Sequence, residues 1–318
     1  MHPALSVIFF TTLSGAGYGL LTWCALAALA QALPARPLLI SLLMALLLVT
    51  IGLLSSLGHL GKPQRAWRAF SQWRSSWLSR EGVASVLTFV PAVLVGAALL
   101  PGMLSPTQAG SAVALSAWGM LACIALIVGA IATVVCTAMI YASLKPIPAW
   151  RHRLVVPVYL LFALLTGGLL LAAVASLSGA SPGNLPAMVA VVLAIALWVL
   201  KRRYWQAIDI TPLPATRGEA VAMPGREVKV FERPHTEDNY LTREMGFVVA
   251  RKHARRLRQV AVVLFALVPV LLMLPVWVFV HLDAGPWFAV AALAALAGTF
   301  VERWLFFAQA RHLVTLYY

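Results

Sequence analysis

The chain consists of long apolar runs separated by short polar breaks. A helix needs about 20 mostly apolar residues to cross a bilayer. Eight runs reach that length, at 5–31, 37–58, 82–100, 112–142, 151–177, 184–203, 259–281 and 286–312. A strand exposed to lipid cannot satisfy its backbone hydrogen bonds, so each run is expected to be helical. The pattern therefore predicts an all-α integral membrane protein, a bundle of eight transmembrane helices with both termini on the same side.

The composition agrees with this class. Of the 318 residues, 62% are hydrophobic and only 11% are charged, whereas soluble domains are about half apolar and about a quarter charged. The net charge of +14 would suggest nucleic-acid binding in a soluble protein. Here the basic residues lie between apolar runs instead of on one amphipathic face. They therefore indicate membrane orientation and not nucleic-acid binding.

Lys and Arg residues gather on one side of the predicted bundle. Of the 24, five lie in 59–81, three in 143–153 and thirteen in 201–258, while the opposite loops hold only Arg36. The positive-inside rule predicts that the basic face and both termini are cytoplasmic. A basic face can also serve as a dock for an acidic partner, and the sequence leaves both causes open.

Residues 1–318 are predicted to form a single membrane anchor domain with one long non-membrane segment at about 204–258. This segment holds most of the acidic residues, several prolines and the stretch RPHTEDNYLTREMG. Loops of this length are usually functional or disordered. We predict that it docks a partner, the alternative being a flexible linker.

The block HLGKPQRAWRAFSQWRSSWLSREG, residues 59–82, combines basic, aromatic and titratable side chains. His59 closes the second apolar run and Glu81 opens the third, so both are expected where the apolar slab meets water. A quinone needs an apolar slot and groups that exchange protons at its carbonyls. His59 and Glu81 are the catalytic candidates. The other candidates for quinone binding are Lys62, Arg65, Trp77 and Arg80. On spacing alone, an aromatic belt with interfacial charges explains the block equally well.

Glu302 and Arg303 interrupt the last apolar run about ten residues before its end. This spacing places them near mid-bilayer, where ionisable groups are costly and usually functional or paired. Adjacent residues on a helix do not face each other, so each is expected to need a partner elsewhere in the bundle. Structural pairing and proton conduction both remain open.

The sequence offers no redox centre of its own. Its seven histidines lie at span ends or in loops, whereas a membrane haem generally takes its axial histidines from within helices, so we predict no haem. Three cysteines within apolar runs lack metal-site spacing, so we predict no metal. Without such a centre the chain does not oxidise a substrate by itself. It hands electrons between a quinone and a neighbour's cofactor.

Five stretches resemble the dimethyl sulfoxide reductase anchor-subunit family. They are HPALSVIFFTTLSGAGYGL, the block HLGKPQRAWRAF…SWLSRE, YASLKPIPAW, PHTEDNYLTREMGFVVARKHARRLR and ERWLFFAQARHLVTLYY. Together they touch most of the chain, and the second is the most specific. Within the family, the Pro-His-Thr…Asn-Tyr segment looks most like the membrane subunit of cytoplasmic sulfite-oxidising (sulfite:quinone) molybdoenzymes.

This resemblance implies an eight-helix anchor without haem. Such anchors attach a molybdopterin catalytic subunit and a four-cluster iron–sulfur subunit, and exchange electrons with ubiquinone or menaquinone. The family's quinone-site histidine and glutamate match His59 and Glu81. In the Pro-His-Thr…Asn-Tyr segment, we assign partner docking to His235, Asn239, Tyr240 and Arg243.

The expected protein is thus a multi-pass subunit of a bacterial inner membrane. Its cytoplasmic partner would oxidise sulfite, and electrons would pass through iron–sulfur clusters to quinone near His59. The alternative is the same anchor run in reverse, oxidising quinol for a dimethyl sulfoxide-type reductase. A secondary transporter is disfavoured, because the two halves of the chain show no matching broken helices.

Overall fold

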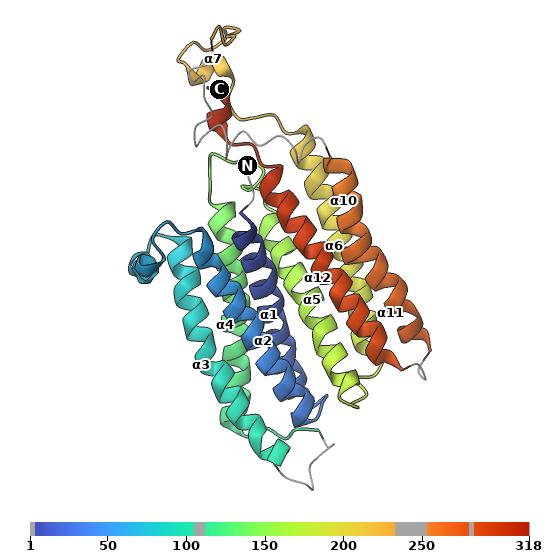
Figure 1. Ribbon diagram of the computed structural model, residues 1–318. Helices are drawn as coiled ribbons and strands as arrows, with labels where there is room; N and C mark the ends of the chain where they lie inside the picture. The colour runs from blue at the N-terminus through green and yellow to red at the C-terminus, as the bar shows by residue number, and fades with distance from the viewer. Residues whose placement is uncertain (1–3, 105–111, 233–252, 280–282, 318) are drawn as a thin grey trace.

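The eight apolar runs fold into eight long helices in the computed structural model, which describes residues 4–104, 112–232, 253–279 and 283–317. Six are continuous from start to end: α1 (Leu5–Leu29), α2 (Ala35–Ser56), α3 (Trp77–Leu104), α4 (Ala117–Ala142), α5 (Val155–Leu177) and α6 (Leu185–Ile210). The seventh span joins α10 (Ala254–Val262), the π-helical turn η4 (Val263–Leu267) and α11 (Val268–Val278), and the eighth is α12 (Ala284–Ala308). The predicted all-α membrane bundle is confirmed (Figure 1).

Several predicted helix boundaries differ from the structure by four or more residues, and two of these differences matter for the site. The third helix begins at Trp77 instead of residue 82, and the sixth ends at Ile210 instead of residue 203. In both places the buried stripe of the helix continues through polar residues. As a result, Glu81 lies one turn inside α3, and Lys201 lies more than two turns before the end of α6.

Both described ends of the chain lie at one end of the bundle (Figure 1). Three hydrogen bonds hold this end together. Ser55 Oγ donates to the Ser6 carbonyl at 3.2 Å, the Leu313 N–H donates to the Pro146 carbonyl at 3.0 Å, and Tyr317 Oη donates to the Ala220 carbonyl at 3.1 Å. The short elements η1 (Leu57–His59), η2 (Pro63–Gln72), α7 (Arg217–Ala220) and η5 (Leu313–Leu316) lie at this end, which we call the basic end.

Helices α1 and α5 touch backbone to backbone. A Cβ atom on Gly19 would overlap the backbone carbonyl of Ala163, and one on Gly167 would overlap the backbone of Gly19. Trp23 Nε1 also donates to the Leu164 carbonyl at 2.8 Å. Small residues allow this approach, which replaces the hydrophobic driving force that lipid does not provide. Helix α1 is therefore packed closely against α5 in the interior of the bundle.

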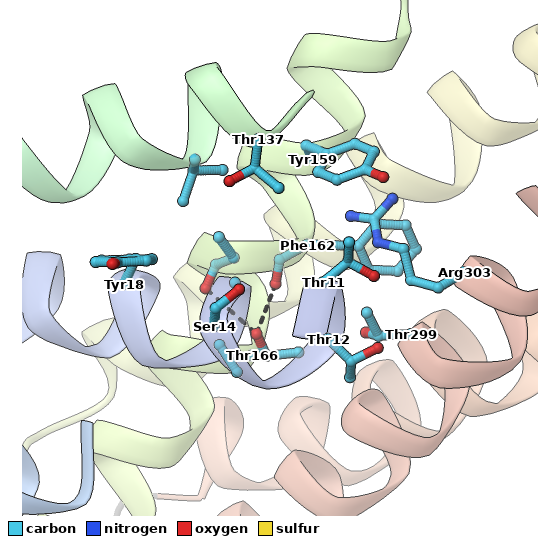
Figure 2. A pocket seen from close by; sticks show the side chains of 14 residues that line it. Thr11, Thr12, Ser14, Tyr18, Thr137, Tyr159, Phe162, Thr166, Thr299 and Arg303 are labelled. Atoms are coloured by element: carbon cyan, nitrogen blue, oxygen red, sulfur yellow. Dashed lines mark hydrogen bonds between the residues drawn. The ribbon is translucent and has the colours of Figure 1, made fainter. Parts of the chain in front are cut away.

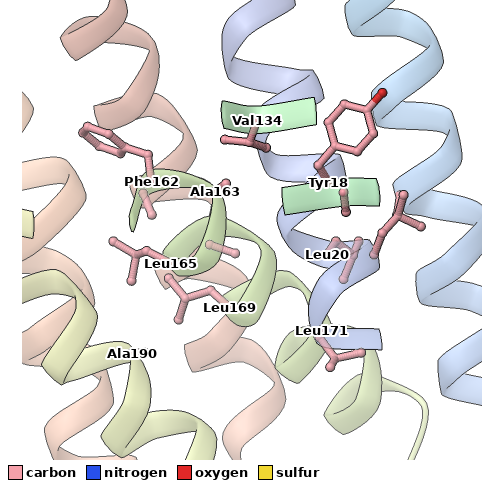
Figure 3. Close-up of a cluster of buried hydrophobic side chains, with 14 of the residues drawn as sticks. Tyr18, Leu20, Val134, Phe162, Ala163, Leu165, Leu169, Leu171 and Ala190 are labelled. Carbon is pink, nitrogen blue, oxygen red and sulfur yellow. The ribbon is translucent and has the colours of Figure 1, made fainter. Parts of the chain in front are cut away.

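The core lies around this contact and is apolar (Figure 3). Tyr18 and Leu20 of α1, Val134 of α4 and Phe162 of α5 are buried there. The outward faces of α2, α3 and α4 expose large aliphatic side chains, for example Leu43, which is 65% exposed. Apolar surface on this scale is typical of a protein that faces lipid.

Candidate functional site

The block 59–82 folds into η1, η2 and the first turns of α3, with η2 packed against the start of α3. Ser79 Oγ donates to the Ala69 carbonyl of η2. The Phe70 ring lies close to Gly82, since a Cβ atom built on Gly82 would be 3.3 Å from Phe70 Cε1. The aromatic segment is thus fixed against the first turns of α3 at Ser79 and Gly82, on either side of Glu81 in the sequence.

Arg80 holds the turn between η2 and α3. Its Nε donates to the Trp73 carbonyl at 3.0 Å and its Nη2 donates to the Arg74 carbonyl at 2.6 Å. The guanidinium also lies over the Trp77 ring, 4.4 Å from the centroid. These contacts make Arg80 a positioning residue for the turn, and its contact with a quinone carbonyl or with Glu81 remains a prediction.

Glu81 is a buried carboxyl, one turn inside α3. The helix α3 begins four residues earlier, and the side chain is only 5% exposed, so it is buried within the bundle, while its position at the edge of the apolar slab stays a prediction. Thr137 Oγ1 of α4 lies 3.5 Å from Glu81 Oε1 and also donates to the Thr133 carbonyl of its own helix at 3.0 Å, and Ser85 Oγ donates to the backbone carbonyl of Glu81 at 2.7 Å. A buried carboxyl beside a hydroxyl group is a candidate for proton exchange.

The other candidates of the block lie nearer its surface. Lys62 and Arg65 are exposed at the start of η2, and Trp77 is partly buried at the start of α3. His59 ends η1, which contacts η2. The side chain of His59 is outside the described structure, so its pairing with Glu81 stays a prediction.

The described part of the predicted docking loop contains α7, which a capping box closes. Thr216 Oγ1 accepts the Glu219 N–H at 3.3 Å, and Glu219 Oε2 accepts the Thr216 N–H at 2.7 Å. The backbone N–H and the hydroxyl of Thr216 hold the pKa of Glu219 below its usual value. The predicted docking residues His235, Asn239, Tyr240 and Arg243 lie outside the described residues.

Glu302 and Arg303 are buried in α12, and the structure corrects two expectations about them. The helix ends at Ala308 and not at residue 312, so Glu302 lies about 9 Å from the end of α12 by helix rise, nearer to it than expected, and its depth in the bilayer stays a prediction. The two side chains also meet, with Arg303 Nη1 3.3 Å from Glu302 Oε2. Long side chains bridge adjacent positions by bending along the helix.

The partner of Glu302 is Lys201 of α6, which sequence reasoning missed. Lys201 Nζ lies 2.5 Å from Glu302 Oε1, and both side chains are buried. The sequence prediction counted Lys201 among the basic loop residues. A signal was present, because Lys201 follows Leu197 and precedes Tyr204 at helical spacing on the buried stripe of α6. The ammonium lies 4.2 Å from the centroid of the Tyr204 ring.

A small cavity lined by hydroxyl groups lies between Arg303 and α1 (Figure 2). The centre of a water-sized sphere can occupy about 10 Å³ in this cavity. This space is enough for about one water molecule. The hydroxyls are those of Thr11, Thr12, Ser14, Tyr18, Thr137, Tyr159, Thr166 and Thr299. Since Thr137 Oγ1 also lies 3.5 Å from Glu81 Oε1, this cavity adjoins that carboxyl.

The basic end carries two histidines that cap backbone groups. Nδ1 of His152 accepts the Leu154 N–H at 3.2 Å, and Nδ1 of His312 accepts the Val314 N–H at 3.0 Å. Burial lowers the pKa of both imidazoles, and for His152 the nearby charges of Arg153 and Lys201 lower it further. Across the described residues, no three His, Cys, Asp or Glu side chains gather as metal ligands. The prediction of no haem stays a prediction.

Known proteins resemble the chain along its whole length. Residues 1–309 match the family described as DMSO reductase anchor subunit (DmsC). One subunit of the sulfite dehydrogenase of Allochromatium vinosum is 33% identical over 325 residues, which cover 100% of this chain and 99% of that protein. The chain is therefore a multi-pass membrane protein that belongs to the DMSO reductase anchor subunit family.

Proposed function

We propose that this chain exchanges electrons between the quinone pool and the redox cofactors of a partner bound at its basic end. The observation that carries the proposal is the buried carboxyl of Glu81, which lies beside the Thr137 hydroxyl in the helix that the aromatic segment packs against. A quinone takes up two protons with its two electrons, so its site needs a group that exchanges protons beside an apolar slot. Glu81 meets the first need and η2 the second.

The residues at η2 suit a quinone that enters from the lipid. The cavity beside Glu81 has space for about one water molecule, so it does not hold a quinone ring. The outer surface of the block offers apolar contacts instead, with Trp73 and Leu78 about half exposed. We place the ring between η2 and α3, with Glu81 and His59 exchanging protons at its carbonyls. Lys62, Arg65, Trp77 and Arg80 would surround it.

The partners follow from the family and from the similar protein. An anchor subunit implies a catalytic subunit to hold, and the similar protein is named as a subunit of a sulfite dehydrogenase. We propose a molybdopterin subunit that oxidises sulfite and a four-cluster iron–sulfur subunit that passes the electrons to quinone. Both would dock at the basic end through the segment 204–258, including His235, Asn239, Tyr240 and Arg243.

The charge distribution supports a cytoplasmic docking face. The connections at the basic end hold most of the Lys and Arg residues, and the positive-inside rule places such an end in the cytoplasm of a bacterial inner membrane. A tag within 204–258 should be inaccessible from outside intact cells. Accessibility from outside would overturn this orientation.

The reverse direction is the second candidate, because the family is named for DMSO reductase. In that case quinol is oxidised at the same site to feed a reductase. No described feature favours a transporter.

Affinity purification of the chain in mild detergent tests the proposal. We expect molybdenum, iron and two further subunits to co-purify, together with sulfite-dependent reduction of a water-soluble quinone. Reduction of dimethyl sulfoxide with quinol, but no sulfite activity, would select the second candidate. A chain that purifies without redox partners and does not react with quinone would refute both.

A further inference from the structure

The buried cluster on α6 and α12 carries more positive charge than negative. Lys201 and Arg303 face one carboxylate, that of Glu302, and all three side chains are at most 2% exposed. Aromatic faces compensate part of the excess, since the Arg303 guanidinium lies 3.4 Å from the centroid of the Tyr159 ring. Burying a net charge is costly. Loss of a proton from Lys201 relieves this cost, because guanidinium does not deprotonate in proteins and ammonium can.

Arg303 also has donors without acceptors. Its Nε and Nη1 atoms have no hydrogen-bond partner among the described residues, and Nη1 lies 3.3 Å from Glu302 Oε2 without hydrogen-bond alignment. The buried hydroxyls of Thr12 and Tyr159 likewise lack partners in the described part of the chain. Arg303, Thr12 and Tyr159 line the cavity in Figure 2. Buried polar groups left this way are usually satisfied by an internal water.

Other cavity hydroxyls keep free acceptor sites. Thr166 Oγ1 donates to the Phe162 carbonyl at 2.7 Å, and Thr299 Oγ1 donates to the Ala295 carbonyl at 2.7 Å. Each donor hydrogen is therefore used within its own helix, and the oxygen lone pairs remain for a water. Thr137, which also lines the cavity, lies 3.5 Å from Glu81 Oε1.

The same cluster lies below a basic cleft at the surface. The cleft has space of about 560 Å³ between the α4–α5 connection and the ends of α6, α10 and α12. Trp205 stands between the cleft and Lys201, since its ring is 4.8 Å from the Lys201 ammonium and 5.4 Å from the Arg258 guanidinium. Arg258 is held by Asp209 at 2.6 Å. The Trp205 ring thus separates Lys201 from the cleft, and polar groups extend from Arg303 through the cavity to Thr137 beside Glu81.

We propose that the Lys201–Glu302 pair is an internal proton donor and acceptor that serves Glu81 through a water bound in the cavity beside Arg303. This role rests on the quinone function proposed above. During reduction, each quinone takes up two electrons from the partner and two protons, giving quinol. Glu81 passes one of these protons to a quinone carbonyl and regains one from the cavity water, and His59 passes the other proton to the second carbonyl. Lys201–Glu302 replaces the proton of the cavity water and is reloaded from the aqueous side at the basic end.

Charged and aromatic groups surround Lys201. Glu302 and Arg303 face it from α12, Tyr204 and Trp205 lie on its own helix, the Arg258 guanidinium lies over the Trp205 ring, and the His152 ring packs against that of Tyr204. Glu302 contacts the Lys201 ammonium directly, whereas Arg303 and Arg258 add positive charge around it. Arg303 keeps its charge throughout and is a positioning residue for the cavity water.

Quinone reduction by the purified complex tests the proposal. Glu302→Gln and Lys201→Met should each lower the maximal rate about tenfold or more, because a step of proton transfer is lost. The KM for quinone should be unchanged. The loss should grow as pH rises and protons become scarce, and the solvent isotope effect should increase. Glu302→Asp should recover part of the rate. Arg202→Met is the matched control, because its exposed side chain lies next to Lys201.

A purely structural role is separated by the double variant Lys201→Met/Glu302→Gln. It removes both charges of the pair, so assembly should recover while the rate and the altered isotope effect do not. Thr299→Val removes a cavity hydroxyl without changing charge and should also slow turnover. Thr22→Val is its control, because Thr22 makes the same type of bond, at 2.9 Å to the Tyr18 carbonyl, outside the cavity.

A wild-type rate, pH profile and isotope effect in both the double variant and Thr299→Val would overturn this inference alone. A wild-type complex that does not react with quinone would instead refute the proposed function.

Discussion

The Lys201 ammonium lies 2.5 Å from Glu302 Oε1, although 101 positions separate the two residues in the chain. The pair joins α6 to α12 within an apolar bundle. A buried ion pair adds little stability compared with well-packed apolar residues, but the loss of one partner leaves the other charge buried alone. The pair therefore matters for stability mainly because removing one of its charges is costly.

Removal of one member of the pair should be costly. Glu302→Gln should destabilise the protein by about 3–5 kcal/mol, because the charges of Lys201 and Arg303 then stay buried without a carboxylate, whereas Lys201→Met should cost less, because Glu302 still faces Arg303. The double variant should lose much less than the sum. Unfolding in mild detergent measures all three, and additive losses would show that the side chains do not interact.

At the proposed quinone site, Glu81→Gln or His59→Ala should slow quinone turnover by about a hundredfold or more, as expected for loss of a general acid–base group. Assembly with the partners should remain, since η2 is held by Ser79, Phe70 and Arg80. Asp283→Asn is the control, because Asp283 is exposed at the start of α12, at the end of the bundle opposite the basic end. Normal quinone kinetics in both site variants would remove these residues from the site.

The contact between α1 and α5 predicts that Gly19→Ala and Gly167→Ala prevent normal packing. Each added methyl would overlap backbone atoms of the facing helix. Backbone atoms cannot move aside as a side chain can by changing its rotamer. Gly15→Ala provides a matched control on the same helix, because nothing lies within 4 Å of its added Cβ. Melting temperature and yield in detergent compare the three. Equal values would show that α1 and α5 are farther apart than described.

The free energy of unfolding should decrease as pH decreases, because His152 and His312 at the basic end then become protonated. Both have pKa values lowered in the folded state from the usual 6.5, so each favours the neutral form that accepts a backbone N–H. Their contribution to stability is therefore complete above about pH 6.5 and is lost as pH falls through the lowered pKa.

The double variant His152→Asn/His312→Asn tests this dependence, because an Asn side chain offers an oxygen acceptor that does not titrate in this range. Unfolding curves between about pH 7.5 and 5 should show a smaller loss of stability in the variant than in the wild type. Parallel curves would assign the pH dependence to other groups.

Deletion of residues 225–245 should release the partner subunits from the membrane, since this stretch carries the predicted docking residues. The chain itself should still insert, because the deleted stretch lies outside the eight helices. A deletion of 105–110 in a connection at the opposite end is the control. Partners that stay bound after the first deletion would show that docking occurs elsewhere.

The apolar runs were enough to predict the eight helices, because the bilayer fixes both length and composition. Boundaries at Trp77 and Ile210 were missed because the helices extend past the apolar window into polar residues. Lys201 was missed because it was counted with the basic residues of 201–258, although it also lies within the predicted run 184–203. Its role depends on α12, a contact that no local pattern encodes. Glu81 and His59 were proposed from their residue types and their positions at the ends of the apolar runs, and the resemblance matched them, but the contact of Thr137 with Glu81 requires α3 and α4 to be placed together.

The buried charges of the described chain are all found in one half of the bundle. Glu81, Lys201, Glu302 and Arg303 lie within about 14 Å of the basic end by helix rise, and the opposite half buries only neutral groups among the described residues. Electrons and protons would then reach quinone from the same side, so turnover would be electroneutral. We expect a potential-sensitive dye in proteoliposomes to stay silent during turnover, leaving energy conservation to the enzymes that later oxidise the quinol.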